Sequence, residues 1–525
     1  MGESLKLIKA IARVDVLFRF RRTSTIVILL VIAALMYLLI PDIRSGNTLI
    51  QVDGHRVIYN STAIALGTGM MCGLLLSVIG YYLVSNSIKR DILSRVGFIV
   101  ASTQIKNGQY IVGKVIGNIV YLTLIMLACM VSAMIMFFVR GEGQFEPLTF
   151  LYIYVWSITP AIIFCSAVAI CFEAIPKLSG RLGDVAFFFL WAAFLAVPAS
   201  MFEQKMGSRW LQGLDMVGIV QLMSQMEVQF HTTSMSIGQS SFDPSKTPII
   251  MSGLTWSFTD FGLRIVACVV PIFFVLLAWL FFHRFNPTKI KFSVQHTKNL
   301  FLTKLNAMVK PITRTLQFAS TSKRNTSSSL LRVVRADVFA TLALSPFIIL
   351  AMIIFELISL VIDTGALREG VLPAIIVVLI IALSDIVTRD YSAGMMNLLY
   401  TTPKIKNNYV VWKFTSAFVV TLCFTLIPIL RLTFTLPASA VSLLIGSCLI
   451  TAGAVGMGIL TRSRKAYMGI FLMLLYISLN AAGDPPLDFA GFYGKATPLV
   501  QSIYALIAGT LIFTAWVKYK FSLRN

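Results

Sequence analysis

Apolar residues run in long blocks along most of this chain, and polar residues collect between the blocks. A helix needs about 20 apolar residues to cross the hydrocarbon core of a bilayer, which is about 30 Å thick. Blocks approaching or exceeding this length lie near residues 23–40, 63–84, 110–139, 150–172, 185–201, 258–282, 345–362, 371–386, 409–430, 440–460, 466–480 and 498–517. The pattern predicts an all-α fold, a polytopic membrane helix bundle of about 12 transmembrane helices.

Composition excludes a water-soluble protein. Hydrophobic residues make up 57% of the chain and charged residues 13%, whereas soluble proteins contain about 25% charged residues. All seven cysteines lie within apolar blocks and none forms a CxxC pair, so we expect small buried hydrophobes. A basic amphipathic stretch precedes the first block, and Pro41-Asp42 follows it in place of small cleavage-site residues, which indicates an uncleaved span.

The basic residues predict the orientation. Thirty-two of the 44 Lys and Arg residues lie on one side of the alternating spans, with both termini and residues 283–344, and nine lie in the opposite loops. Because basic loops stay in the cytoplasm, we expect a multi-pass protein of the cell inner (plasma) membrane with both termini cytoplasmic. The net charge of +22 then needs no nucleic acid, and membrane lipid is the expected partner of the basic segments.

The sequence contains an internal repeat. Residues 90–114 align without a gap to residues 389–413: both segments begin with Arg-Asp, and they share a Thr, a Tyr, a Val and a final Lys at the same spacing. The matched pairs are Arg90 and Arg389, Asp91 and Asp390, Thr103 and Thr402, Tyr110 and Tyr409, Val112 and Val411, and Lys114 and Lys413. Two further matches occur in the same order: 13–16 with 335–338, and 214–218 with 487–491. Three ordered matches indicate a duplicated unit.

The repeat predicts the domain organisation. Residues 1–284 form a first six-span half with an N-terminal amphipathic helix, 285–330 a basic cytoplasmic linker, and 331–525 a second six-span half. Since six is even, the two halves share one orientation and can form a parallel pseudo-twofold pair around a central pathway.

The repeated loops are candidates for a partner contact. In residues 91–102, Ile92, Val96, Ile99 and Val100 follow helical spacing, which predicts a short amphipathic helix at the membrane face. Such a helix can dock into a groove of a partner, with Arg90 and Arg389 as charged anchors. The alternative is an interfacial helix that only steadies the bundle.

In this combination the chain resembles the permease subunits of type 2 ABC exporters. The shared features are a basic lead-in with an Asp, a first span, and a cytoplasmic loop of the form RD.......L..TTP.....Y...K, as in 389–413. The resemblance covers each half and most of the chain. The first loop departs from the pattern, with Ser102-Thr103-Gln104 in place of Thr401-Thr402-Pro403.

The resemblance implies export of a hydrophobic or amphipathic substrate, powered by separate ATPase subunits that bind ATP and Mg. It implies that loops 85–108 and 387–408 sit in clefts of these subunits, in two copies, and that the lead-ins 3–22 and 328–344 lie along the inner membrane surface. The residues implied to couple the permease to the ATPases are Arg90, Asp91, Thr103, Lys106, Arg389, Asp390, Thr402, Pro403 and Lys404.

Catalytic chemistry is not indicated. Residues 108–114 spell GxxxxGK, but Val115 follows in place of the Ser or Thr that holds magnesium, and the segment enters a span. The four histidines are isolated, and we expect no metal or cofactor in this chain and no enzyme activity of its own.

One acidic residue, Glu356, is flanked on both sides by long apolar stretches. A carboxylate there serves an interhelical hydrogen bond, a proton relay or a substrate pathway. The alternative function is a secondary active transporter of the major facilitator kind, which shares twelve spans and cytoplasmic termini. Loop 85–109 lacks the Gly-x-x-x-Asp-Arg signature of that class.

Overall fold

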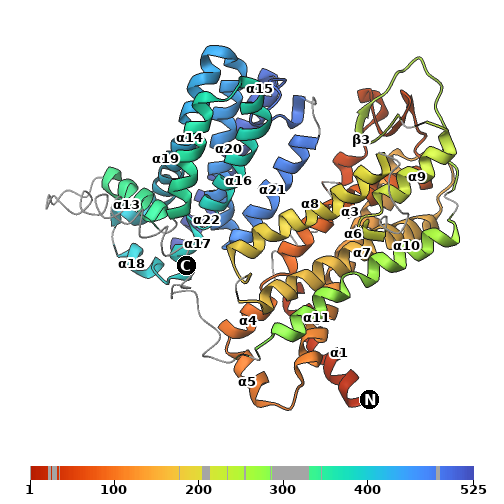
Figure 1. Cartoon of the computed structure of the whole chain (residues 1–525), viewed down its shortest axis with the longest axis horizontal. Helices are drawn as coiled ribbons and strands as arrows, with labels where there is room; N and C mark the ends of the chain where they lie inside the picture. The colour runs from red at the N-terminus through yellow and green to blue at the C-terminus, as the bar shows by residue number, and fades with distance from the viewer. Residues whose placement is uncertain are drawn as a thin grey trace. The chain divides into compact units, whose positions relative to one another are not determined.

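In the computed structural model the chain forms two compact units, 1–292 and 293–525 (Figure 1). The structure describes residues 2–21, 25, 32, 34, 36–176, 178–203, 213–232, 234–253, 256–283, 285, 330–343, 346–401, 403–480 and 485–524. Most of the expected first span 23–40, almost all of the expected linker 285–330 and the expected coupling residue Thr402 lie outside these residues.

The first unit is mainly helical. Its elements are α1 (Gly2–Phe20), η1 (Ile43–Ser45), β1 (Asn47–Val52), β2 (His55–Arg56), α3 (Ser61–Val84), α4 (Ser87–Leu93), α5 (Val96–Ser102), α6 (Asn107–Arg140), α7 (Pro147–Ala174), α8 (Arg181–Glu203), α9 (Ile219–Phe230), β3 (Met235–Ser241), α10 (Phe258–Val269) and α11 (Ile272–Phe281). The core lies along α3 and α7, which pack on each other and on α6.

The second unit contains α13 (Leu330–Ala343), α14 (Pro346–Val361), α15 (Thr364–Ala366), η3 (Leu367–Val371), α16 (Leu372–Leu383), α17 (Thr388–Ser392), α18 (Met396–Tyr400), α19 (Pro403–Thr435), α20 (Pro437–Thr461), α21 (Arg464–Asn480), η4 (Pro485–Leu487) and α22 (Pro498–Arg524). Here α20 lies at the centre, packed against α19, α21 and α22.

The long helices begin where the sequence supplies a cap. The Asn60 side chain accepts a hydrogen bond from the backbone N–H of Ala63 at the start of α3, and Ser257 forms a reciprocal capping pair with Asp260 at the start of α10. Proline occupies the first turn of α7 and of α20, where its missing N–H costs no hydrogen bond. Beyond the caps, α3, α7 and α20 are apolar around their circumference, as expected in a bilayer.

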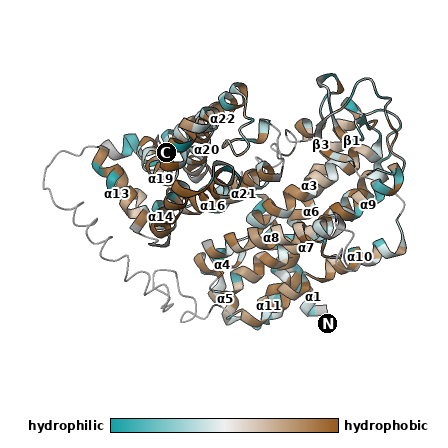
Figure 2. Ribbon diagram, turned by 45° about the horizontal axis from the view of Figure 1, so that its top comes forward, coloured by the Kyte–Doolittle hydropathy of each residue, from teal (hydrophilic) through white to brown (hydrophobic). Residues whose placement is uncertain are grey.

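Nine helices among the described residues are long and apolar enough to cross a membrane, so the protein is a polytopic helix bundle of the membrane class (Figure 2). They correspond to nine of the twelve expected spans. Of the other three, 23–40 lies mostly outside the described residues, 345–362 is the shorter apolar helix Ile348–Val361, and 466–480 is α21, which has 17 residues.

The expectation of a purely helical fold is wrong for the large loops of the first unit. Strands β1, β2 and β3 form an antiparallel sheet in the order β2-β1-β3, in which residues 47–52 pair with residues 235–241. The strands come from loops 41–62 and 202–257, which are 140 or more residues apart in sequence. Neither strand shows a strong alternating pattern, and no local signal indicates such a distant partner.

The loops of the first unit collect at two ends of the bundle, as the alternation of spans predicts. At one end, β1 pairs with β3 and Arg56 bonds to Glu142 over 3.0 Å, which joins loops 41–62, 202–257 and 140–149. At the other end, Ser87 of loop 85–109 bonds to Asp15 of α1 and to Glu173 at the end of α7. In Figure 1 the labels α4 and α5 lie near α1, and β3 lies at the opposite end of this unit.

We expect Pro244→Cys and Gln104→Cys to label from opposite sides of the membrane, because both positions are exposed and they lie at the two ends of the bundle. A membrane-impermeant maleimide applied to intact cells should modify one of them, and the same reagent applied to inverted vesicles should modify the other. Labelling of both variants from one side would contradict the arrangement.

Candidate functional site

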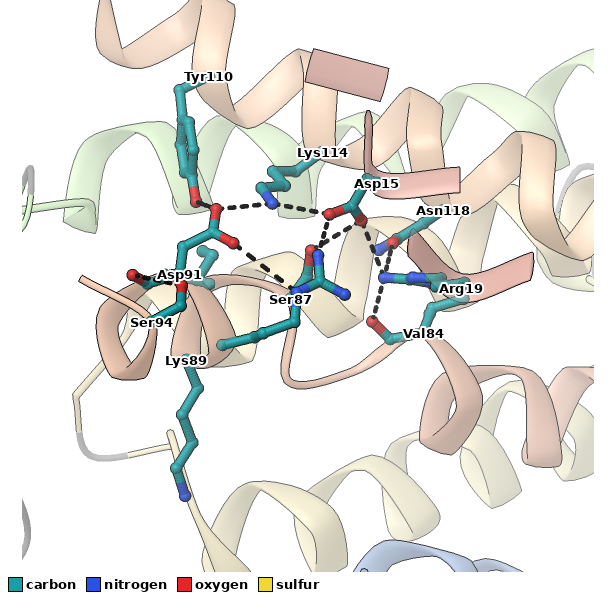
Figure 3. Close-up of polar contacts among 12 residues, drawn as sticks. Asp15, Arg19, Val84, Ser87, Lys89, Asp91, Ser94, Tyr110, Lys114 and Asn118 are labelled. Carbon is teal, nitrogen blue, oxygen red and sulfur yellow. Dashed lines mark hydrogen bonds and ion pairs between the residues drawn. The ribbon is translucent and has the colours of Figure 1, made fainter. Parts of the chain in front are cut away.

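A buried carboxylate joins three elements of the first unit (Figure 3). The Lys114 amine lies 2.8 Å from a carboxylate oxygen of Asp15 and 2.7 Å from one of Asp91. The Tyr110 hydroxyl donates to Asp91 over 2.7 Å, and the Arg90 guanidinium pairs with Asp15. These five residues, called the first polar cluster, link the lead-in helix α1, loop helix α4 and spanning helix α6.

Further donors surround Asp15 in the same unit. The Arg19 guanidinium donates to Asp15 over 3.1 Å, to the Asn118 side-chain oxygen over 2.7 Å and to the Val84 carbonyl over 3.0 Å. The Ser87 hydroxyl donates to Asp15 over 3.1 Å. Both Asp15 oxygens therefore have partners, as a buried carboxylate requires.

Helical spacing brings these groups together. Tyr110, Lys114 and Asn118 are four residues apart and share one face of α6, and Asp15 and Arg19 do the same on α1. The Glu173 carboxylate accepts hydrogen bonds from the first backbone N–H groups of α4, those of Ser87 at 3.1 Å and Ile88 at 2.7 Å. A negative charge is favourable at a helix N-terminus, so this contact stabilises the start of α4.

The second unit contains a cluster with the same connections. The Lys413 amine lies 3.1 Å from Asp337 and 2.8 Å from Asp390. The Tyr409 hydroxyl donates to Asp390 over 3.0 Å, and the Arg389 guanidinium pairs with Asp337. This second polar cluster links α13, α17 and α19 by the residue types that link α1, α4 and α6.

In each unit an aromatic ring at or near the last described helix packs against the tyrosine of the cluster. Tyr110 stacks on Phe282, just past α11, with ring centroids 5.3 Å apart. Tyr409 stacks on Tyr519 of α22 with centroids 5.1 Å apart. Each tyrosine is thus held by a ring on one side while its hydroxyl bonds to the aspartate of the loop.

The two clusters differ around the aspartate of the lead-in. Thr341 occupies the position of Arg19, and its hydroxyl accepts from Arg389 over 2.9 Å; it brings no charge of its own. Ile386 and Ala417 occupy the positions of Ser87 and Asn118. As a result one carboxylate oxygen of Asp337, a residue 7% exposed, has no hydrogen-bond partner among the described residues.

Charge keeps Asp15 ionised. Burial alone raises the pKa of this carboxyl, but the positive charges of Lys114, Arg19 and Arg90 act together and hold the pKa of Asp15 below its ordinary value.

In each loop the first short helix ends just before an equivalent residue with a left-handed backbone conformation. Arg95 and Gly394, both five residues after the cluster arginine, have φ of +62° and +68°, and a short helix begins again just after each of them. Large apolar side chains of the two loops are exposed: Leu93, Val96, Phe98 and Ile99 in the first, and Met395 and Leu398 in the second.

The structure separates the expected coupling residues into two groups. Arg90, Asp91, Arg389 and Asp390 face inward into the clusters. Thr103 and Lys106 are exposed at the end of the first loop, and Pro403 and Lys404 begin α19. Sequence reasoning about the loops alone misses six cluster residues: Asp15, Tyr110, Lys114, Asp337, Tyr409 and Lys413. All six lie in repeated segments, and the repetition is the signal that could have identified them.

The intramembrane Glu356 bonds to a neighbouring helix. One of its carboxylate oxygens accepts from the backbone N–H of Ile427 in α19 over 3.1 Å, next to Pro428, which interrupts the hydrogen bonding of that helix. The other oxygen is buried without a partner among the described residues. The contact is an interhelical hydrogen bond, which is one of the three roles that the sequence left open for Glu356.

The third sequence match is a pair of turns that share a glycine conformation but differ in their hydrogen bonds. Asp215 accepts from the backbone N–H groups three and five residues later, at Gly218 and Val220, whereas Asp488 accepts from those five and seven residues later, at Tyr493 and Lys495. Gly218 and Gly491, each three residues after its aspartate, have φ of +84° and +76°, a conformation that favours glycine.

We expect Lys114→Met and Lys413→Met each to lower the free energy of unfolding by about 3–5 kcal/mol, because each leaves a buried aspartate of the lead-in and an aspartate of the loop without their shared cation. Denaturant titration in detergent micelles measures the loss. Lys106→Met, which removes an exposed lysine beside the first cluster, is the matched control and should change the value by less than about 0.5 kcal/mol. Equal stability of all three variants would show that the clusters are not structural ties.

A pH dependence follows from Asp15. Because folding lowers its pKa, the stability contributed by this carboxylate is fully present above the unfolded value of about 3.9 and is lost as pH falls through the lower folded value. Between pH 6 and acid conditions the wild-type melting temperature should therefore fall more steeply than that of Asp15→Asn. Parallel curves would contradict the charged state of Asp15.

The features from which function is inferred are the two polar clusters, the loops that they hold and the apolar side chains exposed on those loops. No protein-family model, curated protein or solved structure matches the chain.

Proposed function

We propose that this chain is the transmembrane permease subunit of an ABC exporter, built from two copies of a six-span unit. Each copy presents one cytoplasmic loop, 85–109 or 387–408, to a separate ATPase subunit. The ATPases bind ATP and Mg, and the permease moves a hydrophobic or amphipathic substrate across the inner membrane. The orientation follows the excess of Lys and Arg on the loop side.

The observation that supports the proposal most is the matched pair of clusters. The same five residue types, with the same ion pairs and the same tyrosine contact, tie a loop to a lead-in helix and a span in each unit. Both loops also expose large apolar side chains, which an ATPase subunit bound to the loop would cover.

Within each loop, the exposed and the inward-facing side chains have different roles in this proposal. The exposed apolar side chains, such as Ile99 and Leu398, form the contact with the ATPase, and the inward-facing charges hold the loop against the bundle. Movement of an ATPase subunit would push the loop, and the buried aspartate would pass that displacement to the lead-in and the span, because packed elements move as rigid bodies.

A secondary active transporter is the alternative. It is favoured by the number of expected spans and by cytoplasmic termini, and it would take its energy from an ion gradient. In that case Glu356, an acidic residue within an apolar helix, would be the candidate proton carrier.

Substitution of the exposed loop residues tests the proposal. Ile99→Glu and Leu398→Glu should each weaken binding of the ATPase by about 2 kcal/mol or more, since each places a charge in an apolar contact. The measurement is ATP turnover by the complex purified from its native membrane and reconstituted in liposomes. Ile250→Glu is the matched control, because Ile250 is as exposed as these residues and lies in the opposite loop 202–257.

The expected result is loss of turnover in the two loop variants and wild-type turnover in Ile250→Glu. Wild-type turnover in all three variants, or a pure chain that transports under an ion gradient without any ATPase, would overturn the proposal in favour of the alternative.

A further inference from the structure

The seam between α20 and α22 of the second unit ends at two basic residues. The two helices approach closely along this seam: a methyl group on Gly456 of α20 would lie 3.1 Å from the Leu511 carbonyl oxygen of α22. Seven residues beyond Leu511, the Lys518 amine donates to the Leu460 carbonyl in the last turn of α20. Arg462 is the C-cap residue of the same helix. The two cations therefore flank the end of the seam.

Neither cation is neutralised by the protein. Lys518 and Arg462 are exposed, and neither forms an ion pair with a carboxylate among the described residues. The Lys518 amine uses one of its three N–H donors on the Leu460 carbonyl. The Arg462 guanidinium lies over the Tyr391 ring, 5.1 Å from its centroid, which leaves its N–H groups at the ring edge for another acceptor. The seam thus ends in donors and positive charge that suit an anion.

The exposed face of α22 places these cations at the level of lipid headgroups. Ile507, which is 39% exposed, and Lys518 are eleven residues apart and so lie on one face of the helix, about 16 Å from each other along its axis. One leaflet contributes about 15 Å of hydrocarbon. Trp516, which is 42% exposed, and Lys520, whose amine lies 5.8 Å from the Trp516 ring centroid, have the composition of a membrane interface. A lipid whose chains end near Ile507 therefore has its phosphate near Lys518.

We propose that one anionic phospholipid binds along this seam, with its phosphate on Lys518 and Arg462 and its acyl chains against the exposed apolar face of α22. Basic sites between spanning helices are suited to anionic headgroups, because the phosphate supplies the missing negative charge. The chains cover Ile503 and Ile507, which are 49% and 39% exposed. A zwitterionic phospholipid brings a positive group of its own to the two cations, so it binds more weakly.

The site belongs to the second half alone. The rings of Phe282 and Tyr519 stack on the equivalent tyrosines of the two polar clusters. Phe281, which is 45% exposed, therefore stands in the first unit where Lys518 stands in the second, and it cannot bind a phosphate. The lipid site is separate from the duplicated elements on which the proposed function rests, and its failure would leave that function untouched.

Lipid titration of the delipidated protein in detergent, followed by native mass spectrometry, tests the site. Wild type should bind one phosphatidylglycerol per chain more tightly than it binds phosphatidylcholine. Arg462→Gln and Lys518→Gln should each weaken binding of phosphatidylglycerol by about fivefold, the loss expected when one basic residue is removed from an anionic surface. Glutamine at position 518 keeps a donor for the Leu460 carbonyl, and Lys518→Arg, which keeps the charge, should bind as wild type does.

Lys495→Gln is the matched control. Lys495 is an exposed lysine three residues before the opposite end of α22, so its loss should leave the affinity for phosphatidylglycerol unchanged. As a second readout, this lipid should raise the melting temperature of wild type and Lys495→Gln, and should raise it less in the double variant Arg462→Gln/Lys518→Gln.

Three results would overturn the site. Equal binding of phosphatidylglycerol and phosphatidylcholine by wild type would show that the acyl chains alone are recognised. Unchanged affinity for phosphatidylglycerol in both glutamine variants would place the lipid elsewhere. Displacement of the lipid by millimolar inorganic phosphate, with the same rise in melting temperature from phosphate alone, would show that the two cations bind a free anion.

Discussion

One buried carboxylate in each half joins the lead-in helix, the loop and a spanning helix through ion pairs. Asp15 pairs with cations from α4 and α6, and Asp337 does the same with cations from α17 and α19. A buried charge is tolerated only while its partners stay in place, since loss of one leaves the others uncompensated. Loop, lead-in and span must therefore move together or not at all.

The two polar clusters have the same connections but differ in the number of partners around the aspartate of the lead-in. The first has Arg19, Ser87 and Asn118 around its aspartate, which gives it an additional cation and a partner for each carboxylate oxygen. The second has Thr341 in place of Arg19 and leaves one oxygen of Asp337 without a hydrogen bond among the described residues. The loops also differ in sequence, with Ser102-Thr103-Gln104 in the first where the second has Thr401-Thr402-Pro403, so the two halves have diverged within the same repeated segment.

Most residues of the two clusters could be found from the sequence, because they recur at fixed spacing within short segments. Arginine, aspartate, tyrosine and lysine recur at fixed spacing in 90–114 and 389–413, and α-helical geometry turns such spacing into a common face. Lys114 and Lys413 were matched in the alignment, as were the lead-in segments that contain Asp15 and Asp337. The spacing does not determine which way the side chains point. No local pattern shows whether Arg90 faces outward to a partner or inward to Asp15.

The sequence by itself determined the membrane class, nine spans found where expected and the residues repeated between the halves, because length, hydropathy and spacing are properties of short segments. Only the tertiary structure decided the contacts between segments distant in the chain. These contacts include the sheet of residues 47–52 with 235–241, the inward direction of the loop charges and the contact of Lys518 with the last turn of α20. Each depends on how whole helices pack, which no local pattern records.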